Sequence, residues 1–241
     1  MPQPRSTARR KLERLRYLVR HGGIGGFLFY LCYRFVNRLT RLRIFRMVIL
    51  DASSAPIGPQ LGRLEAYRHG LFTPEELEPY ADDPDNDLSR EFLDYAAAQG
   101  DTCYATFDGN ELVSYCWNSE KPTAIEDGLH IECRPGYIYR YKEYTHPNHR
   151  GRRISSYARA EALCLSAAAG VSGYAGYVEA DNFVSYRALQ RSGHVFAGFV
   201  IVFGKGATPW IWHSPAARDW GFRVVSTPPG TLPHGAIKSY S

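Results

Sequence analysis

The chain has 241 residues, of which 44% are hydrophobic and 22% charged, a composition ordinary for a soluble globular protein. Its length suits one good-sized domain with extensions. The five cysteines are odd in number and lack CxxC spacing, which argues against a disulfide framework and a zinc site. We therefore expect reduced thiols, a cytoplasmic location and no metal.

Positive charge is concentrated at the start of the chain. Residues 1–50 hold 12 of the 29 Lys and Arg and a single acid, Glu13, so this segment carries +11 and the remainder −6. A basic N-terminal segment followed by an acidic remainder predicts an anionic partner for the basic segment. A membrane surface, nucleic acid and an acidic protein all qualify.

Residues 1–46 are predicted to form a basic amphipathic helical extension, interrupted by glycines at 22–26. From Ile24 onward, apolar residues recur at spacings of three and four, which is one helical face: Leu28, Leu31, Phe35, Leu39 and Leu42. The run is too short to span a bilayer, which needs about 20 apolar residues. It starts too late for a secretory signal, and no small-residue cleavage site follows it, so we expect no such signal.

Two interpretations of this extension stay open. It can lie in the interface of an anionic membrane, which would make the protein peripheral at the cytoplasmic face. It can equally be an additional helix that packs on the domain. Nucleic acid is disfavoured as a partner because the arginines are interspersed with Leu and Phe rather than presented as a polar arm.

The first half of the predicted domain, residues 47–205, begins with a strand and two helices. Met47–Asp51 reads as a strand, and 52–62 as a loop. Thr73 and Pro74 are typical of an N-cap and first helical position. A second helix is expected from Asp87 to Gln99 and ends at Gly100.

The second half alternates strands and helices. Asp108-Gly109-Asn110 predicts a hairpin within Thr102–Trp117. The remaining expected elements are a strand at Tyr137–Thr145, a helix at 154–169, a strand at Tyr174–Glu179, a helix at Asn182–Arg191 and a strand at Val195–Phe203. Residues 206–241 form a tail with Pro and Trp but no clear period. This order predicts a mixed α+β sheet with one central strand–helix–strand unit.

A basic corner stands between the strand at 137–145 and the following helix. The segment His146-Pro-Asn-His-Arg150-Gly-Arg-Arg-Ile-Ser155 places three arginines at a helix N-terminus. Unpaired N–H groups and the helix dipole attract anions there, and arginine is disfavoured at that end without a negative partner. The alternative is that the arginines are solvated surface charges.

This corner, the helix after it, and the later Asn182 and Ser192-Gly193-His194 resemble the GNAT superfamily of acyl-CoA-dependent N-acyltransferases. The element order agrees over roughly 47–204. The resemblance implies a central, mostly antiparallel twisted sheet flanked by helices, with a splayed strand pair that forms the acyl-CoA cleft. The basic extension and the tail lie outside the usual core of the family.

The resemblance also assigns cofactor-binding residues. The strand before the corner holds the pantetheine arm by its backbone, and the corner and helix N-terminus hold the pyrophosphate of acetyl-CoA or another acyl-CoA. The residues implied are Tyr144, Thr145, Arg150, Gly151, Arg152, Arg153, Ile154, Ser155 and Asn182. The sequence departs from the family where Arg153 replaces a glycine and Ser155 replaces a small residue.

Three residues are candidates for proton transfer. The family places a tyrosine seven residues after the Asn to protonate the leaving thiolate, and here that position is Leu189. Tyr186, one turn earlier, is the substitute, although a thiolate can also leave unassisted. Glu143 and His146 are candidates for the base that receives the amine proton. By strand alternation Glu143 shares a face with Tyr139 and Tyr141, and an ion-paired structural role is its alternative.

The resemblance therefore implies an N-acyltransferase, most simply an N-acetyltransferase, that moves an acyl group from acyl-CoA to an amine by direct attack. An envelope or polysaccharide precursor at the inner membrane face is a conjectured acceptor. Two alternatives stay open: a long-chain acyltransferase that uses acyl carrier protein, and a GNAT-like module that binds acyl-CoA without catalysis.

Overall fold

The computed structural model describes residues 7–54, 64–81, 83–126, 128–204 and 208–226. The predicted loop at 52–62 and the last part of the predicted tail lie mostly outside this range. Within it, an eight-stranded sheet has the order β10-β9-β1-β8-β7-β4-β3-β2, and a three-stranded sheet has the order β11-β6-β5. All described pairings are antiparallel except that of β7 with β8. The predicted fold class, a mixed and mostly antiparallel sheet flanked by helices, is confirmed.

The predicted elements occur in the predicted order, and β2, β5 and β6 are additional strands that were not expected. The first half of the chain forms α1 (Thr7–Thr40), β1 (Arg43–Asp51), β2 (Arg68–Phe72), α2 (Pro74–Leu77), α3 (Arg90–Gln99), β3 (Thr102–Asp108) and β4 (Glu111–Ser119). The second half forms β5 (Thr123–Glu126), β6 (Leu129–Glu132), β7 (Tyr137–Thr145), α4 (Ile154–Ala168), β8 (Gly173–Glu179), α5 (Phe183–Arg191), β9 (Val195–Phe203), β10 (Trp210–His213), α6 (Pro215–Asp219) and β11 (Arg223–Ser226).

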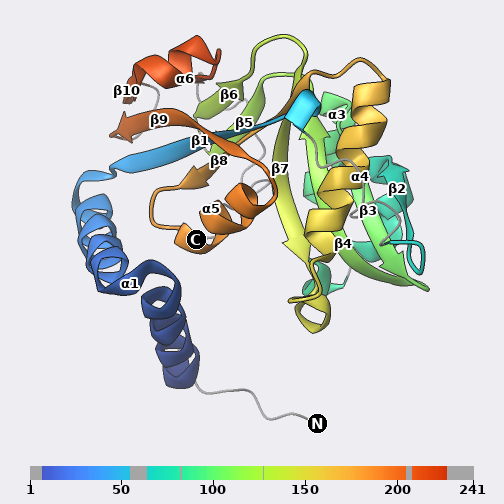
Figure 1. Ribbon diagram of the computed structural model, residues 1–241, viewed down its shortest axis with the longest axis horizontal. Coiled ribbons are helices and arrows are strands. Elements are labelled where there is room, and N and C mark those ends of the chain that lie inside the picture. The colour runs from blue at the N-terminus through green and yellow to red at the C-terminus, as the bar shows by residue number, and fades with distance from the viewer. Residues whose placement is uncertain (1–6, 55–63, 82, 127, 205–207, 227–241) are drawn as a thin grey trace.

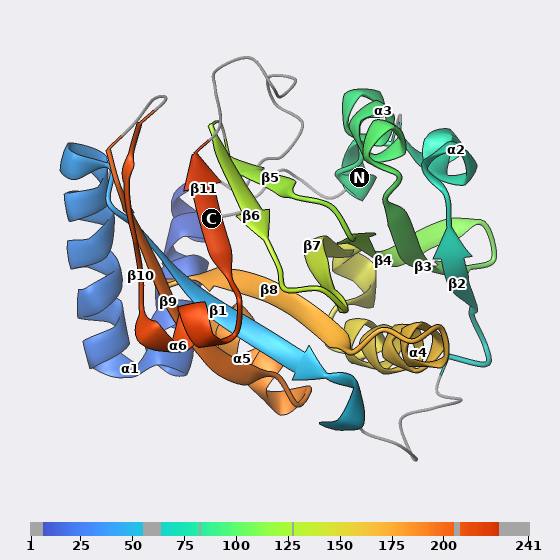
Figure 2. The same cartoon turned by 90° about the horizontal axis from the view of Figure 1, so that it is seen from above.

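The large sheet is the middle layer of three. Figure 2 shows α4 and α5 on one side, and α2, α3 and the small sheet on the other. Each side has its own apolar core: one contains Phe92, Trp117 and Ile131, and the other contains Leu50, Ala162 and Leu163 beneath α4. Both faces of the central strands are therefore buried, which explains the continuous apolar run of β1.

β1 holds a central position although it comes early in the chain. It pairs with β8 on one side and β9 on the other (Figure 1). The strand begins at Arg43, so four residues of the expected extension belong to the sheet. The expected extension is thus joined directly to the middle of the sheet.

Residues 208–226 differ from expectation. We expected a tail without clear periodicity, but this segment forms β10, α6 and β11. β10 pairs with β9, and β11 pairs with β6 in the small sheet. The short strands carry too few residues to show alternation in the sequence, and tertiary pairing rather than local pattern orders them.

Helix α1 is broken at Gly23, where φ is +68° and ψ −178°, within the predicted glycine interruption. Its second half packs against α5 through Phe29 and Phe183, whose rings lie 5.9 Å apart. The Tyr33 hydroxyl accepts a hydrogen bond from the Ile44 backbone at 2.9 Å. No helix of the described residues is long and apolar enough to cross a membrane.

Candidate functional site

Strands β7 and β8 diverge after a short paired stretch. Their parallel pairing covers Tyr137–Tyr139 against Gly173–Ala175. At Gly176 the strands are still close, since a Cβ there would lie 3.4 Å from the Arg140 carbonyl oxygen. Beyond this point the β8-facing backbone edge of β7 has no strand partner among the described residues. The predicted splayed pair is confirmed.

The corner after β7 ends in an uncapped helix. Arg153 is the N-cap of α4, and its side chain makes no capping hydrogen bond. The N–H groups at the start of α4 therefore lack the acceptor that Ser, Thr or Asp would supply. Gly151 and Arg153 both have left-handed backbones, with φ of +82° and +61°. Arg153 thus adopts a backbone conformation that glycine adopts without strain, although its side chain is that of arginine.

A cavity of about 650 Å³ lies between the start of α4 and the end of α5. Six of the predicted cofactor-binding residues line it: Thr145, Arg150, Gly151, Arg153, Ile154 and Ser155. Sequence reasoning missed the opposite wall, which includes Arg191 at the end of α5 and Ser192 directly after it. The signal available for Arg191 was a basic residue in the last turn of a helix, which is too common to indicate a site.

The arginines make this cavity strongly cationic. Arg150, Arg153 and Arg191 are exposed, and none has an ion pair with another described residue. Arg150 is oriented by its Nε, which donates to the Thr145 carbonyl oxygen at 3.0 Å. Guanidinium groups grip phosphate oxygens with two donors each. The geometry therefore fits a polyanion that lies at the N-terminus of α4.

Glu143 and Arg159 form an ion pair beneath this cavity. Arg159 Nη2 lies 2.7 Å from Glu143 Oε1, and Arg159 Nη1 donates to Ser192 Oγ at 2.6 Å. Arg159 is buried, while 30% of the Glu143 side chain is exposed. These contacts connect α4 to β7 through Glu143 and to the end of α5 through Ser192. They hold α4 and α5 in place below the cavity.

The face predicted for Glu143 is wrong. Lys142 adopts a left-handed backbone with φ of +46°, and the register with β4 shifts there so that Lys142 and Glu143 together oppose Cys116. This β-bulge reverses the alternation. Glu143 consequently lies on the α4 side of the sheet, whereas Tyr139 and Tyr141 lie in the core on the α3 side.

The network sets the charge of its members. Burial alone would raise the pKa of Glu143, but Arg159 and Arg140 outweigh it and hold that pKa below its usual value. Burial, reinforced by Arg159 and Arg140, lowers the pKa of His194 to about 3, so this imidazole is neutral. A carboxylate held ionised by two arginines is a weak base, which favours the structural role for Glu143.

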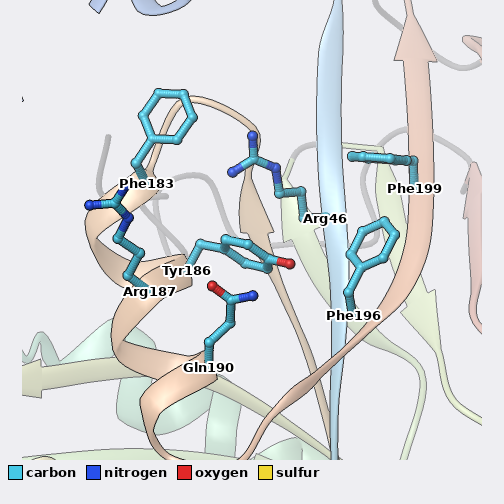
Figure 3. Close-up of a pocket in the computed structure, with 7 residues that line it drawn as sticks. All are labelled: Arg46, Phe183, Tyr186, Arg187, Gln190, Phe196 and Phe199. Atoms are coloured by element: carbon cyan, nitrogen blue, oxygen red, sulfur yellow. The ribbon is translucent and has the colours of Figure 1, made fainter. Parts of the chain in front are cut away.

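Tyr186 does not join the other predicted site residues. It lines a second cavity of about 390 Å³ on the β9 side of α5. Figure 3 shows its ring beside Arg46, whose guanidinium carbon lies 5.0 Å from the ring centroid, with Phe196 and Phe199 across from it. Tyr186 is therefore not among the residues that line the cavity at the start of α4, which contains Arg150, Arg153 and Arg191. The geometry lends no support to a role for Tyr186 as proton donor there.

The other predicted residues have local roles in the described structure. Asn182 is the N-cap of α5, and its side chain accepts from the Ser185 N–H. Tyr144 stacks on Tyr115 and donates to the Asp85 carbonyl, on the face away from α4. Arg152 is exposed at the tip of the corner.

His146 lies with two further ionisable side chains. Its Nδ1 lies 3.4 Å from Glu111 Oε1, and His149 Nε2 lies 3.4 Å from Glu111 Oε2. The backbone N–H of His146 donates to the Val113 carbonyl at 2.8 Å, which joins the corner to β4. His146 is therefore part of a three-residue cluster at the outer edge of the corner.

No protein-family model and no curated protein matches the chain. Among solved structures, a GCN5-related N-acetyltransferase from Sphaerobacter thermophilus is similar at 15% identity with a TM-score of 0.50. The match covers 70% of this chain and 54% of that protein, little more than half its length. A GCN5-related N-acetyltransferase from Kribbella flavida matches at 12% identity and a TM-score of 0.42, over 73% of this chain and 64% of that protein.

These likenesses concern the fold. The chain has the GNAT fold, as the sequence resemblance implied, with the splayed strands and helix N-terminus in the order described above. At 12–15% sequence identity, the roles of residues in those proteins are not transferred to residues of this chain.

Proposed function

We propose that the protein is an acyl-CoA-dependent N-acyltransferase, most simply an N-acetyltransferase. One observation carries the proposal: the divergence of β7 from β8 opens beside an uncapped, arginine-rich helix N-terminus. The free edge of β7 offers backbone groups to the amides of a pantetheine arm. The cationic cavity offers donors to a pyrophosphate.

The proposed reaction needs few protein groups. The acceptor amine loses one proton to solvent and attacks the thioester carbonyl as the free base. The carbon–sulfur bond then breaks, and CoA leaves as a thiolate that takes up the second proton lost by the amine nitrogen. Tyr186 has no part in this proposal because it lies in the other cavity. Glu143 is assigned to position Arg159 and the floor of the site rather than to accept a proton.

The acceptor is proposed to be a cationic amine that approaches from the α3 side of β7. Tyr144 holds the loop at 83–87 by the Asp85 carbonyl, and Tyr115 donates to the Asp87 carbonyl at 2.9 Å. Asp83 and Asp85 thus bring carboxylates close to the end of β7, whereas the Asp87 carboxylate is paired with Lys142 Nζ at 3.5 Å. The field of Asp83 and Asp85 attracts a protonated amine.

Binding and turnover are tested separately. Isothermal titration with acetyl-CoA should show one site, and release of free thiol with a polyamine acceptor should show turnover. Absence of binding at millimolar acetyl-CoA would refute the proposal. Binding without thiol release from any amine would favour the non-catalytic module instead, and turnover only with acyl carrier protein would favour the long-chain alternative.

Helix α5 offers a matched pair of variants. Arg191→Ala removes a charge from the arginine-lined cavity, whereas Arg187→Ala removes one from the cavity of Figure 3. A lost charge-assisted contact of about 1.5–3 kcal/mol should raise the acetyl-CoA dissociation constant roughly tenfold or more in Arg191→Ala. Arg187→Ala should leave it unchanged. Equal effects of the two would show that only net charge matters.

Association of α1 with an anionic membrane surface is proposed as well, because its predicted apolar face is open. Ile24, Leu28, Leu31, Phe35 and Leu39 are all exposed, with 66% and 67% of the last two accessible. The helix packs on α5 by another face, that of Tyr33. The two interpretations of the extension are therefore compatible. The helix packs on the domain, and it still presents an exposed apolar stripe that could enter a membrane interface.

Liposome flotation with anionic lipid tests this association. The double variant Phe35→Ser/Leu39→Ser should reduce flotation strongly, because each serine removes apolar surface that would enter the acyl boundary. Leu165→Ser, on the exposed side of α4, is the matched control and should float like the parent chain. Unreduced flotation of the double variant would refute the proposal.

A further inference from the structure

Glu111, His146 and His149 bring three metal-ligating side chains together at the edge of the cationic cavity, which His149 also lines. Their ligand atoms all lie within 4.8 Å of one another. Glu111 opens β4, while His146 and His149 flank the short turn that follows β7. Two imidazoles and a carboxylate are a ligand set that zinc and related transition metals accept.

The separations suit a shared ion. Each imidazole nitrogen lies 3.4 Å from one oxygen of the Glu111 carboxylate. Two ligands bound tetrahedrally at about 2.0–2.1 Å from zinc are about 3.3 Å apart. Small rotations of the side chains would therefore bring all three within bonding distance of one ion.

The backbone holds the two histidines in place. The His146 N–H donates to Val113 of β4, and the His149 N–H donates to the His146 carbonyl at 2.9 Å. Pro147 between them restricts the turn further. The histidine side chains are 12% and 8% exposed and that of Glu111 is 48% exposed, which leaves an approach from solvent on the carboxylate side.

The surroundings of His146 Nδ1 can accommodate a cation. Its Nδ1 accepts from the Asn148 N–H at 3.4 Å and at the same time faces a carboxylate oxygen of Glu111. A bound cation would take the single lone pair of Nδ1 in place of this long hydrogen bond, and it would neutralise the carboxylate that the nitrogen faces. Sequence reasoning missed this cluster because Glu111 is far from the histidines along the chain.

We infer that Glu111, His146 and His149 form a binding site for a divalent transition metal, with zinc as the best fit. The ion would link the start of β4 to the turn that precedes Arg150. It would thereby restrict the motion of the segment that carries Arg150 beside the cationic cavity. His149 Nδ1 is buried without a hydrogen-bond partner among the described residues. This missing outer contact should make the site weaker than one whose ligands are all supported. The inference stands independently of the proposed reaction.

Metal titration tests the site directly. The full chain, without a histidine tag and stripped with a chelator, should bind one equivalent of Zn²⁺ in competition with a chromophoric chelator. Co²⁺ used in place of zinc should give visible absorption bands whose intensity reports coordination by nitrogen and oxygen. Loss of a supporting outer contact alone costs about 10- to 100-fold in affinity, so loss of a ligand should cost at least about tenfold.

Three substitutions and one control decide the outcome. Glu111→Gln, His146→Gln and His149→Gln should each raise the zinc dissociation constant and weaken the Co²⁺ bands, whereas His69→Gln on β2 should do neither. Glu111→Gln alters an exposed side chain, so it should fold even where a histidine variant does not. The inference is overturned if the chain binds no zinc, or if Glu111→Gln binds it as tightly as the parent.

Discussion

Arg153 combines an unfavourable backbone with a useful charge. Its left-handed φ of +61° costs a non-glycine residue roughly 1 kcal/mol, since Cβ crowds the following carbonyl. The conformation places the residue at the N-terminus of α4, where its guanidinium lines the cationic cavity. Stability and anion binding therefore make opposite demands on this position.

Substitution of Arg153 by glycine should separate these demands. Arg153→Gly is expected to raise the free energy of unfolding by up to about 1 kcal/mol, because glycine adopts this φ without strain. The same change should weaken acetyl-CoA binding, because one guanidinium is lost. Chemical denaturation and titration measure the two effects. Arg152→Gly is the control, because Arg152 has no positive φ and should gain no stability.

At the level of elements, the β7–α4 connection depends on the ion pair of Glu143 with Arg159. The pKa of Glu143 is lowered in the folded protein, so the pair stabilises the fold above the unfolded carboxyl's pKa of about 4.3. That stability is lost as pH falls from there through the folded value. Protonation of the carboxyl removes the attraction that holds α4 against β7.

Glu143→Gln should reproduce that loss at neutral pH. We expect it to lower the free energy of unfolding by roughly 1–3 kcal/mol at pH 7, because Arg159 is left buried without its counter-charge. The difference from the parent chain should shrink as the pH falls below about 4.3 and through the lowered folded pKa of Glu143, because the parent carboxyl then becomes protonated as well. Urea unfolding at a series of pH values checks this, and a difference that stays constant would count against the ion pair.

Regular elements with strong local signals were predictable from the sequence. The hairpin around Gly109, the strand Tyr137–Thr145 and the corner at Arg150 were expected where the structure has them. The bulge at Lys142 was not, because lysine gives no signal for a left-handed backbone. Arg159, Ser192 and Arg191 joined the site through the packing of α4 and α5, which no local spacing reveals.

At the scale of the molecule, β1 joins α1 to the core. Its residues Arg43–Arg46 pair with β9, and Phe45 and Arg46 also pair with β8, so they belong to the middle of the sheet. A chain that starts at Met47 lacks this half of the strand and should be severely destabilised. A chain that starts at Ile24 keeps the Tyr33 contact with Ile44 and the ion pair of Arg34 with Asp181 at 2.7 Å.

Thermal unfolding of the two truncated chains should separate them clearly. We expect the chain from Ile24 to melt close to the parent, and the chain from Met47 to melt far below it or to aggregate. Similar melting of both would mean that the first half of β1 adds little to the sheet. The comparison also shows why point variants, rather than truncation at Met47, suit the flotation experiment.

The central position of β1 has a consequence during synthesis. Asp51 pairs with Gly173, so about 120 residues must be made after β1 before its first neighbour, β8, is available. At translation rates of about 5–20 residues per second, the strand waits roughly 6–24 seconds, and β9 comes later still. During this interval the apolar segment Met47–Leu50 leaves the ribosome with neither neighbour, and such unpaired strands are where chaperones bind and aggregation begins.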